Sequence, residues 1–157
     1  MSGRLVLVRQ GEILSEDGFW EVRHAGEHIA EDGLVPDVLF TSADDQAVAS
    51  SRLLLAPSGR AAGISIVSDA VFDGLDPDRE TLFDLQRRLE TTWLDDIRPL
   101  LEGGAHVLMH APDETVRMLL THAAGLNLDE VARIDVPRGH SITRDNLPFL
   151  LGGGKIV

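Results

Sequence analysis

The amino-acid sequence predicts one three-layer α/β/α domain over residues 1–157, built on a mainly parallel sheet. Short apolar runs of strand length alternate along the chain with longer segments whose apolar residues recur at helical spacing. This alternation is typical of βαβ units, which place helices on both faces of a parallel sheet. The length is that of one ordinary domain, and 43% of the residues are hydrophobic. The chain can therefore bury a substantial core.

The expected strands are short apolar segments bounded by glycine, proline or polar residues, which end strands. Four of them form the body of the predicted sheet: 4–9, 34–41 (with Val38-Leu39-Phe40 at its centre), 64–67 and 105–110. Two closing strands are expected at 131–136 and 141–143.

Helical periodicity occupies the intervals between these strands, at 20–30, 42–55, 80–101 and 114–124. The longest of these segments carries one apolar stripe, formed by Leu82, Leu85, Leu89, Trp93, Ile97 and Leu101. The acidic stretch 69–79 contains glycine and proline and predicts a loop. Trp93, like Trp20, is interpreted as a packing residue.

Charge and composition limit which molecules this protein can bind. The formal net charge of −12 repels nucleic acid and anionic membrane surfaces. With no cysteine, there is no disulfide and no zinc–thiolate site. No signal peptide or membrane span is evident, so a cytoplasmic protein is expected. No cofactor-binding fingerprint is present, so no cofactor is expected. The expected partner is a small molecule or a protein, and the chain is a candidate homodimer.

The most informative segment is the first strand and the loop that follows it. Leu5-Val6-Leu7-Val8 runs directly into Arg9-Gln10-Gly11-Glu12. A buried strand that ends in a polar, glycine-containing turn delivers that turn to the rim of the sheet. Ligands bind at this rim in open α/β sheets, so the loop is a candidate binding site.

This segment resembles the signature of the histidine phosphatase (phosphoglycerate mutase-like) superfamily, in which the strand ends in Arg-His-Gly-Glu. Further along the chain, Pro36-Asp37-Val38-Leu39-Phe40-Thr41-Ser42 is similar to that superfamily's second strand. The second half carries other similar segments in the same order: Thr115-Val116-Arg117-Met118-Leu119-Leu120, Gly125-Leu126 and Val136-Pro137-Arg138-Gly139. The resemblance implies a trimmed phosphoglycerate mutase-like domain.

At the positions of the superfamily's catalytic groups, this chain differs. Gln10 stands where the resemblance implies the histidine that accepts the phosphoryl group, and Pro112 stands at the second histidine. Gln46 takes the place of the second phosphate-binding arginine. An amide is only weakly nucleophilic and cannot replace an imidazole in forming a phospho-intermediate. The expected function is therefore that of a catalytically inactive member with a binding or regulatory role.

Two charged residues that the resemblance implies for the superfamily's site are kept in this chain, as Arg9 and Asp73. Arg9 either binds an anion or pairs with Glu12 or Asp73. The replacements elsewhere are accompanied by acids, since Asp44 and Asp45 precede Gln46 while Asp113 and Glu114 follow Pro112. The residues expected to bind a ligand are Arg9, Gln10, Gln46, Asp73, His110, Asp113 and His140.

Two alternative functions stay open at this point. In the first, the chain is a divergent phosphatase or mutase that acts on a phosphate monoester through Arg9, His110 and Asp73. The opposing interpretation of His110 is a histidine packed within the sheet, and that of His140 is a surface turn residue. In the second, His24 and His28 of the sequence His-Ala-Gly-Glu-His form part of a zinc hydrolase site. No carboxylate ligand on a later helix completes that motif, so no metal is expected.

Overall fold

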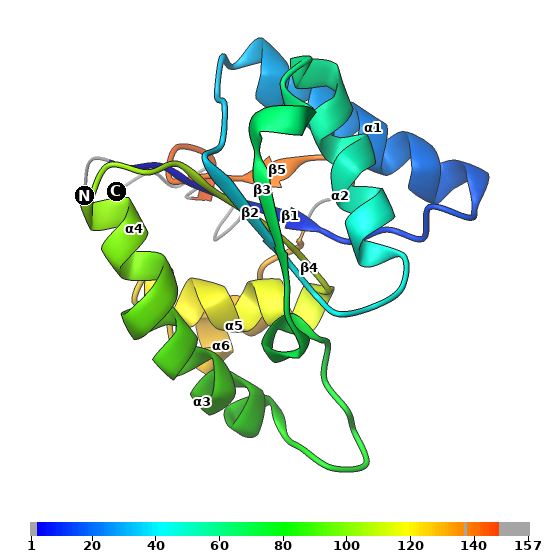
Figure 1. Cartoon of the computed structure of the whole chain (residues 1–157). Helices are drawn as coiled ribbons and strands as arrows, with labels where there is room; N and C mark the ends of the chain where they lie inside the picture. The colour runs from blue at the N-terminus through cyan, green and yellow to red at the C-terminus, as the bar shows by residue number, and fades with distance from the viewer. Residues whose placement is uncertain (1–2, 137, 148–157) are drawn as a thin grey trace.

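The computed structural model describes residues 3–136 and 138–147. Within them, a five-stranded sheet has the order β3-β2-β4-β1-β5 (Figure 1). Its strands are β1 (Leu5–Arg9), β2 (Val38–Thr41), β3 (Ser65–Ser68), β4 (Val107–Ala111) and β5 (Ser141–Ile142). The first four are mutually parallel, and β5 runs antiparallel to β1. The predicted fold class, an α/β fold with a mainly parallel sheet, is confirmed.

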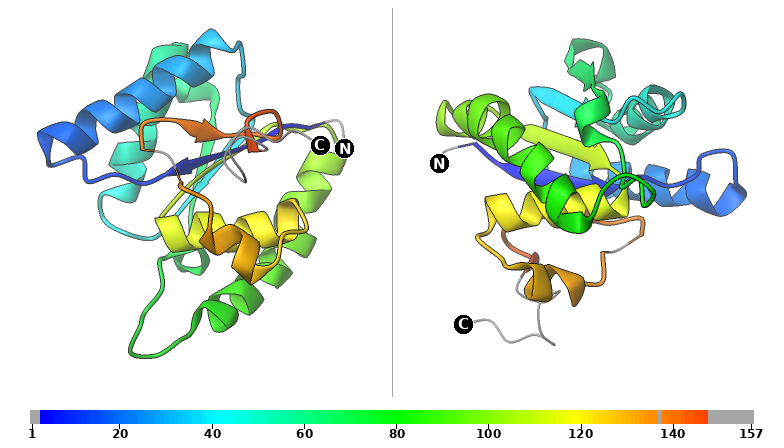
Figure 2. Two further views of the ribbon diagram at one scale, coloured as in Figure 1. Left: turned by 180° about the vertical axis from the view of Figure 1, so that it is seen from behind. Right: turned by 90° about the horizontal axis from the view of Figure 1, so that it is seen from below.

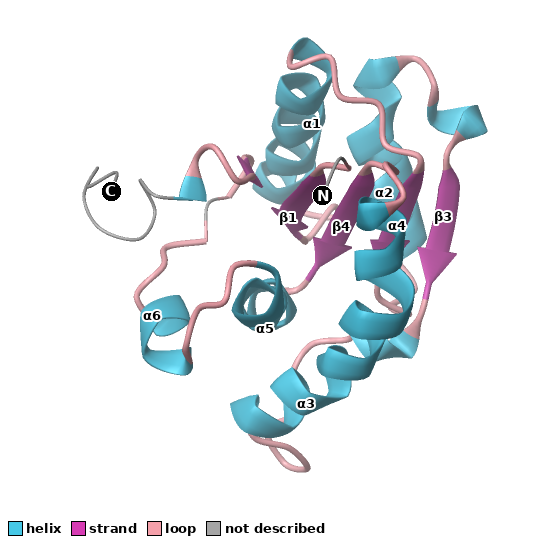
Figure 3. Ribbon diagram, turned by 90° about the vertical axis from the view of Figure 1, so that its left-hand side faces the viewer, coloured by secondary structure: helices cyan, strands magenta, loops and turns pink. Residues whose placement is uncertain are grey.

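Helices cover both faces of this sheet, as Figure 3 shows. One face carries α1 (Glu16–Glu31) and α2 (Ala47–Leu55). The opposite face carries α3 (Leu82–Thr92), α4 (Arg98–Glu102), α5 (Asp113–Ala123) and α6 (Leu128–Ala132). No helix of the described residues is long and apolar enough to cross a membrane.

Alternation along the strands divides the core into two layers. Val6 and Val8 of β1 pack with the apolar residues of α1 and α2, whereas Leu7 packs with α3, α4 and α5. In β4, Leu108 joins the first layer and Met109 the second. Because successive side chains of a strand point to opposite faces, a fully apolar strand is what a sheet covered on both sides requires.

The predicted continuous helix 80–101 is interrupted. Between α3 and α4 lies the π-helical turn η4 (Trp93–Ile97). The apolar residues from Leu85 to Leu101 recur every fourth position, a repeat that drifts around a helix of 3.6 residues per turn. A wider π turn corrects this drift, and Pro99 cannot donate the hydrogen bond that would continue an α-helix there. All five residues of this stripe are buried (Leu85, Leu89, Trp93, Ile97 and Leu101), while Leu82 is exposed.

The prediction of a strand at 131–136 is wrong, since residues 128–132 form α6. A capping box begins this helix: the Asn127 side chain accepts from the Glu130 amide at 2.8 Å, and the Glu130 carboxylate accepts from the Asn127 amide at 3.2 Å. The spacing Asn-x-x-Glu is the sequence signal for this helix start. The closing strand expected at 141–143 is present as β5. Pro137 of the Val136–Gly139 motif lies outside the described residues.

Gly26 allows α1 to approach α2 closely. A β-carbon at this position would lie 2.2 Å from the Leu54 carbonyl oxygen. We therefore expect Gly26→Ala to lower the free energy of unfolding by about 1–3 kcal/mol, the range for overpacked cores. Gly63→Ala is the matched control, because a β-carbon there meets no atom within 4 Å. Urea denaturation of both variants measures the difference, and equal midpoints would contradict this helix contact.

Candidate functional site

A pocket of about 370 Å³ lies where β1, β2 and β4 end, at the rim of the sheet. Three loops build it: the loop after β1, the loop that leads into α2, and the turn between β4 and α5. Parallel strands bring these loops to one edge of the sheet. The lining residues are Arg9, Gln10, Gly11, Glu12, Asp44, Gln46, Ala47, Ser50, Pro112, Asp113 and Glu114.

Gln10 is held by hydrogen bonds to the ends of the neighbouring strands. Its amide nitrogen lies 3.0 Å from Thr41 Oγ1, 2.9 Å from Ser42 Oγ and 3.1 Å from the His110 carbonyl oxygen. The amide has two N–H donors, so these three acceptors use its whole donor capacity. At this position, the side chain joins β1 to β2 and β4.

Charge in the pocket is predominantly negative. Among the described residues that line it, Arg9 is the single arginine, whereas four lining residues are acidic: Glu12, Asp44, Asp113 and Glu114. Arg9 makes no ion pair with any described residue. The fold therefore places the two predicted acidic turns beside Arg9, although Asp45 is not part of the lining.

Asp113 is the first residue of α5. It lines the pocket and also makes a structural ion pair. Its Oδ2 accepts from Arg117 Nε at 2.9 Å, and Arg117 also donates to the carbonyl oxygens of Val131 and Ile134. The other oxygen, Oδ1, is buried without a hydrogen-bond partner among the described residues. Buried polar atoms without a partner are uncommon in folded proteins. Asp113 also offsets the partial positive charge at the start of α5, which would otherwise attract an anion.

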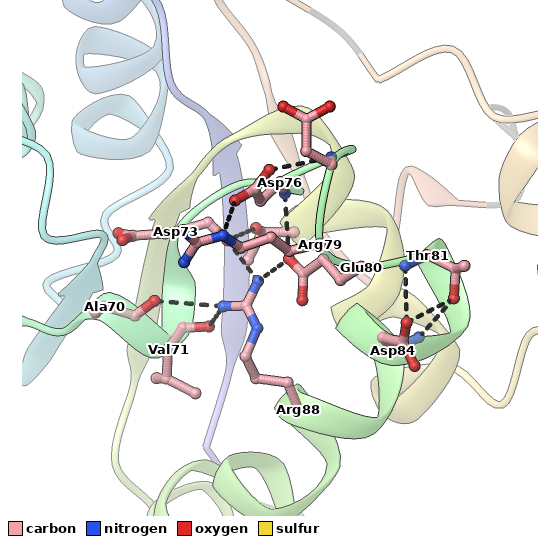
Figure 4. Close-up of polar contacts among 11 residues, drawn as sticks. Ala70, Val71, Asp73, Asp76, Arg79, Glu80, Thr81, Asp84 and Arg88 are labelled. Carbon is pink, nitrogen blue, oxygen red and sulfur yellow. Dashed lines mark hydrogen bonds and ion pairs between the residues drawn. The ribbon is translucent and has the colours of Figure 1, made fainter.

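Asp73 has a structural contact outside the pocket lining. Its Oδ1 accepts from the Ala43 amide at 2.8 Å, which ties the loop after β3 to the turn that carries Asp44. Arg88 of α3 holds the same loop, donating to the carbonyl oxygens of Val71 at 2.6 Å and Asp73 at 3.2 Å and pairing with Glu80 at 2.8 Å (Figure 4). The carboxylate of Asp73 thus positions the pocket wall.

The side chain of His110 lies inside the fold. The residue is fully buried, with Nδ1 3.2 Å from Ser51 Oγ and Nε2 3.5 Å from Ser50 Oγ. Burial lowers its pKa to about 4, so the ring is neutral at neutral pH. Ser50, one helical turn after Gln46, separates the imidazole from the pocket. The interpretation of His110 as a histidine packed within the sheet agrees with this position.

His140 lies apart from this pocket. Its ring packs against those of His24 and His28 on α1, with centroid distances of 5.1 and 5.3 Å. Several residues that line the pocket are outside the set predicted to bind a ligand, among them Glu12 and Ser50. Glu12 belongs to the Arg-Gln-Gly-Glu loop, and Ser50 follows Gln46 by four residues, so loop membership and helical spacing were their sequence signals.

Comparisons with known proteins agree with the fold described above. The chain is 26% identical to the 2,3-bisphosphoglycerate-dependent phosphoglycerate mutase of Leifsonia xyli, over 80% of this chain and 73% of that relative. Its fold matches the α-ribazole phosphatase of Shigella flexneri with a TM-score of 0.63 at 14% identity, covering 90% and 94% of the two chains. YhfR of Bacillus stearothermophilus matches with a TM-score of 0.62 at 16% identity, over 90% and 95%. No protein-family model matches the chain.

These likenesses define the class of protein. The chain has the fold of the histidine phosphatase superfamily, and the resemblance expected from its motifs is confirmed. By sequence, the chain is similar to bacterial 2,3-bisphosphoglycerate-dependent phosphoglycerate mutases.

We expect Gln10 to stabilise the fold through the hydrogen bonds described above. Gln10→Leu leaves Ser42 Oγ and the ends of two strands without this donor, and should lower the free energy of unfolding by about 1–3 kcal/mol. Gln46→Leu, in the same pocket, is the matched control because no hydrogen bond of its side chain is found among the described residues. Chemical denaturation compares the two variants. A Gln10→Leu variant as stable as Gln46→Leu would refute the structural role.

The buried neutral ring of His110 predicts a pH dependence of stability. Its folded pKa of about 4 is below the unfolded value of about 6.5, so the unfolded chain binds more protons between these values. Stability from the neutral ring is therefore full above pH 6.5 and is lost as the pH falls towards 4. In His110→Gln we expect the loss over this range to be smaller by roughly 3 kcal/mol. Urea unfolding from pH 7 to 4 measures it, and parallel curves would contradict the shift.

Proposed function

We propose that this protein is a catalytically inactive member of the histidine phosphatase class whose pocket binds a small molecule or a protein partner. One observation carries the proposal: Gln10, at the position that the resemblance assigns to the nucleophile, has its amide committed to the ends of β2 and β4. No histidine is found among the described residues that line the pocket.

The chemistry of phosphoryl transfer supports this proposal. The first step needs an unprotonated ring nitrogen that attacks phosphorus, and a carboxamide has no comparable lone pair. The charge that spreads over the equatorial oxygens must then be stabilised by cationic groups, each worth roughly 2.7–4 kcal/mol in mutational studies of oxyanion sites. Arg9 is the cation available in the described lining, because Gln46 and Pro112 have replaced the others.

Electrostatics of the pocket favours a different kind of ligand. Asp113 is paired with Arg117, but Glu12, Asp44 and Glu114 still outnumber Arg9 in the lining. This excess of negative charge disfavours a phosphate dianion and attracts groups that are cationic or rich in hydrogen-bond donors. A homodimer and a cytoplasmic location stay predictions, and sedimentation of the purified chain measures the first.

The alternative, a divergent phosphatase, rests on the guanidinium of Arg9, which makes no ion pair within residues 3–136 and 138–147. It would require His110 to leave its contacts with Ser50 and Ser51, or to act through Ser50, which lies between the ring and the pocket. It would also require Asp73 to release the Ala43 amide. The arrangement found here favours the binding role because both candidate groups are already engaged.

A panel of phosphate monoesters separates these two functions. We expect the metal-free wild type to hydrolyse none of them faster than Arg9→Ala, since the nucleophile is missing. The triple variant Gln10→His, Gln46→Arg, Pro112→His serves as a comparison. Release of phosphate by this variant alone would assign the inactivity of the wild type to the replaced side chains. Turnover by the wild type that disappears in Arg9→Ala would refute the proposal and support the divergent enzyme.

A further inference from the structure

Three histidines from two distant segments meet on the surface of α1. His24 and His28 stand one turn apart on the helix, with their Nε2 atoms 3.1 Å apart, and His140 comes from the turn before β5. Each residue offers one ring nitrogen, and these three atoms all lie within 4.8 Å of one another. Figure 2 shows the segment that leads into β5 running beside α1.

The fold holds His140 in this place through its neighbours in sequence. Gly139 has a φ of +71°, a conformation that favours glycine. A β-carbon on it would lie 3.4 Å from the Cα and the carbonyl oxygen of Glu21, so the turn lies directly on α1. On its other side, Ser141 and Ile142 pair with β1. His140 is therefore fixed between a helix contact and a strand pair.

The charged residues around the three histidines are mainly acidic. Glu31 lies 3.8 Å from His28 Nδ1. The charged residues that line the adjoining groove are Asp17, Glu21, Glu27 and Arg138.

We propose that His24, His28 and His140 form a binding site for one divalent transition-metal ion, such as Zn²⁺. Tetrahedral zinc with Zn–N bonds of 2.0–2.1 Å needs ring nitrogens roughly 3.3 Å apart. His24 and His28 already meet this requirement, and His140 needs to close by at most about 1.5 Å from the 4.8 Å limit. Imidazole ligands select zinc, copper or nickel over calcium and magnesium, which prefer oxygen. Three ligands leave the fourth position open to water.

This site is independent of the pocket at the end of β1. None of the three histidines lines that pocket among the described residues, so metal binding and the absence of phosphatase activity are tested separately. The metal would join α1 to the turn before β5. The sequence motif His-x-x-Glu-His supplies two ligands, and Glu27 between them pairs with Arg23 at 3.3 Å, which leaves the third ligand to His140.

Calorimetric titration of the untagged, chelator-treated full chain with Zn²⁺ tests the proposal. We expect one ion per chain for the wild type. His140→Ala should weaken binding by at least about 10-fold, since even partners outside the ligand shell cost 10–100-fold when removed, and His24→Ala/His140→Ala should abolish it. Both side chains are exposed, so these variants are expected to fold. His106→Asn is the matched control, because His106 lies outside the cluster and asparagine keeps an acceptor for the Arg4 amide.

Two further readouts make the outcome decisive. Co²⁺ bound to the wild type should show the intense visible absorption of four-coordinate cobalt, and His140→Ala should lose it. Zn²⁺ should raise the midpoint of thermal unfolding of the wild type and of His106→Asn but not of the double variant. A wild type that does not bind Zn²⁺, or a His140→Ala variant that binds it as tightly as the wild type, would overturn the three-histidine site.

Discussion

The fold and the pocket at the rim both depend on the position of β4 in the middle of the sheet. This strand pairs with β1 on one side and β2 on the other, and every residue from Val107 to Ala111 is buried. A central parallel strand needs helices on both faces, and its carboxyl end must stop at the rim beside those of its neighbours. The pocket is the consequence of this geometry, because the loops after β1 and β2 meet the start of α5 there.

At this rim, a hydrogen-bond network occupies the position that the resemblance gives to a nucleophile. The Gln10 amide, Thr41 and Ser42 join three strand ends at distances between 2.9 and 3.1 Å. Asp73 and Arg117 make comparable contacts with the surrounding loops. These hydrogen bonds tie the loops around the pocket to the strand ends.

Different structural features position the pocket and the histidine cluster. The loops that build the pocket follow the ends of β1, β2 and β4, so its place follows from sheet topology. The histidine cluster instead combines one helix face with a turn more than 110 residues later in the chain, and depends on the contact of Gly139 with α1. Both lie in an acidic chain of net charge −12, a field that favours cations at either place.

The sequence by itself determined the strand and helix alternation, the identity of the loop at the rim, and the presence of Gln10 and Pro112 where the resemblance implies histidines. These are local properties, since periodicity and residue type are written in neighbouring positions. Only the tertiary structure decided that the side chain of His110 lies under α2, that Asp73 holds Ala43, and that η4 interrupts the long helix. It also decided that His140 meets His24 and His28. Contacts between segments far apart in sequence depend on how the layers pack, and no local pattern specifies that packing.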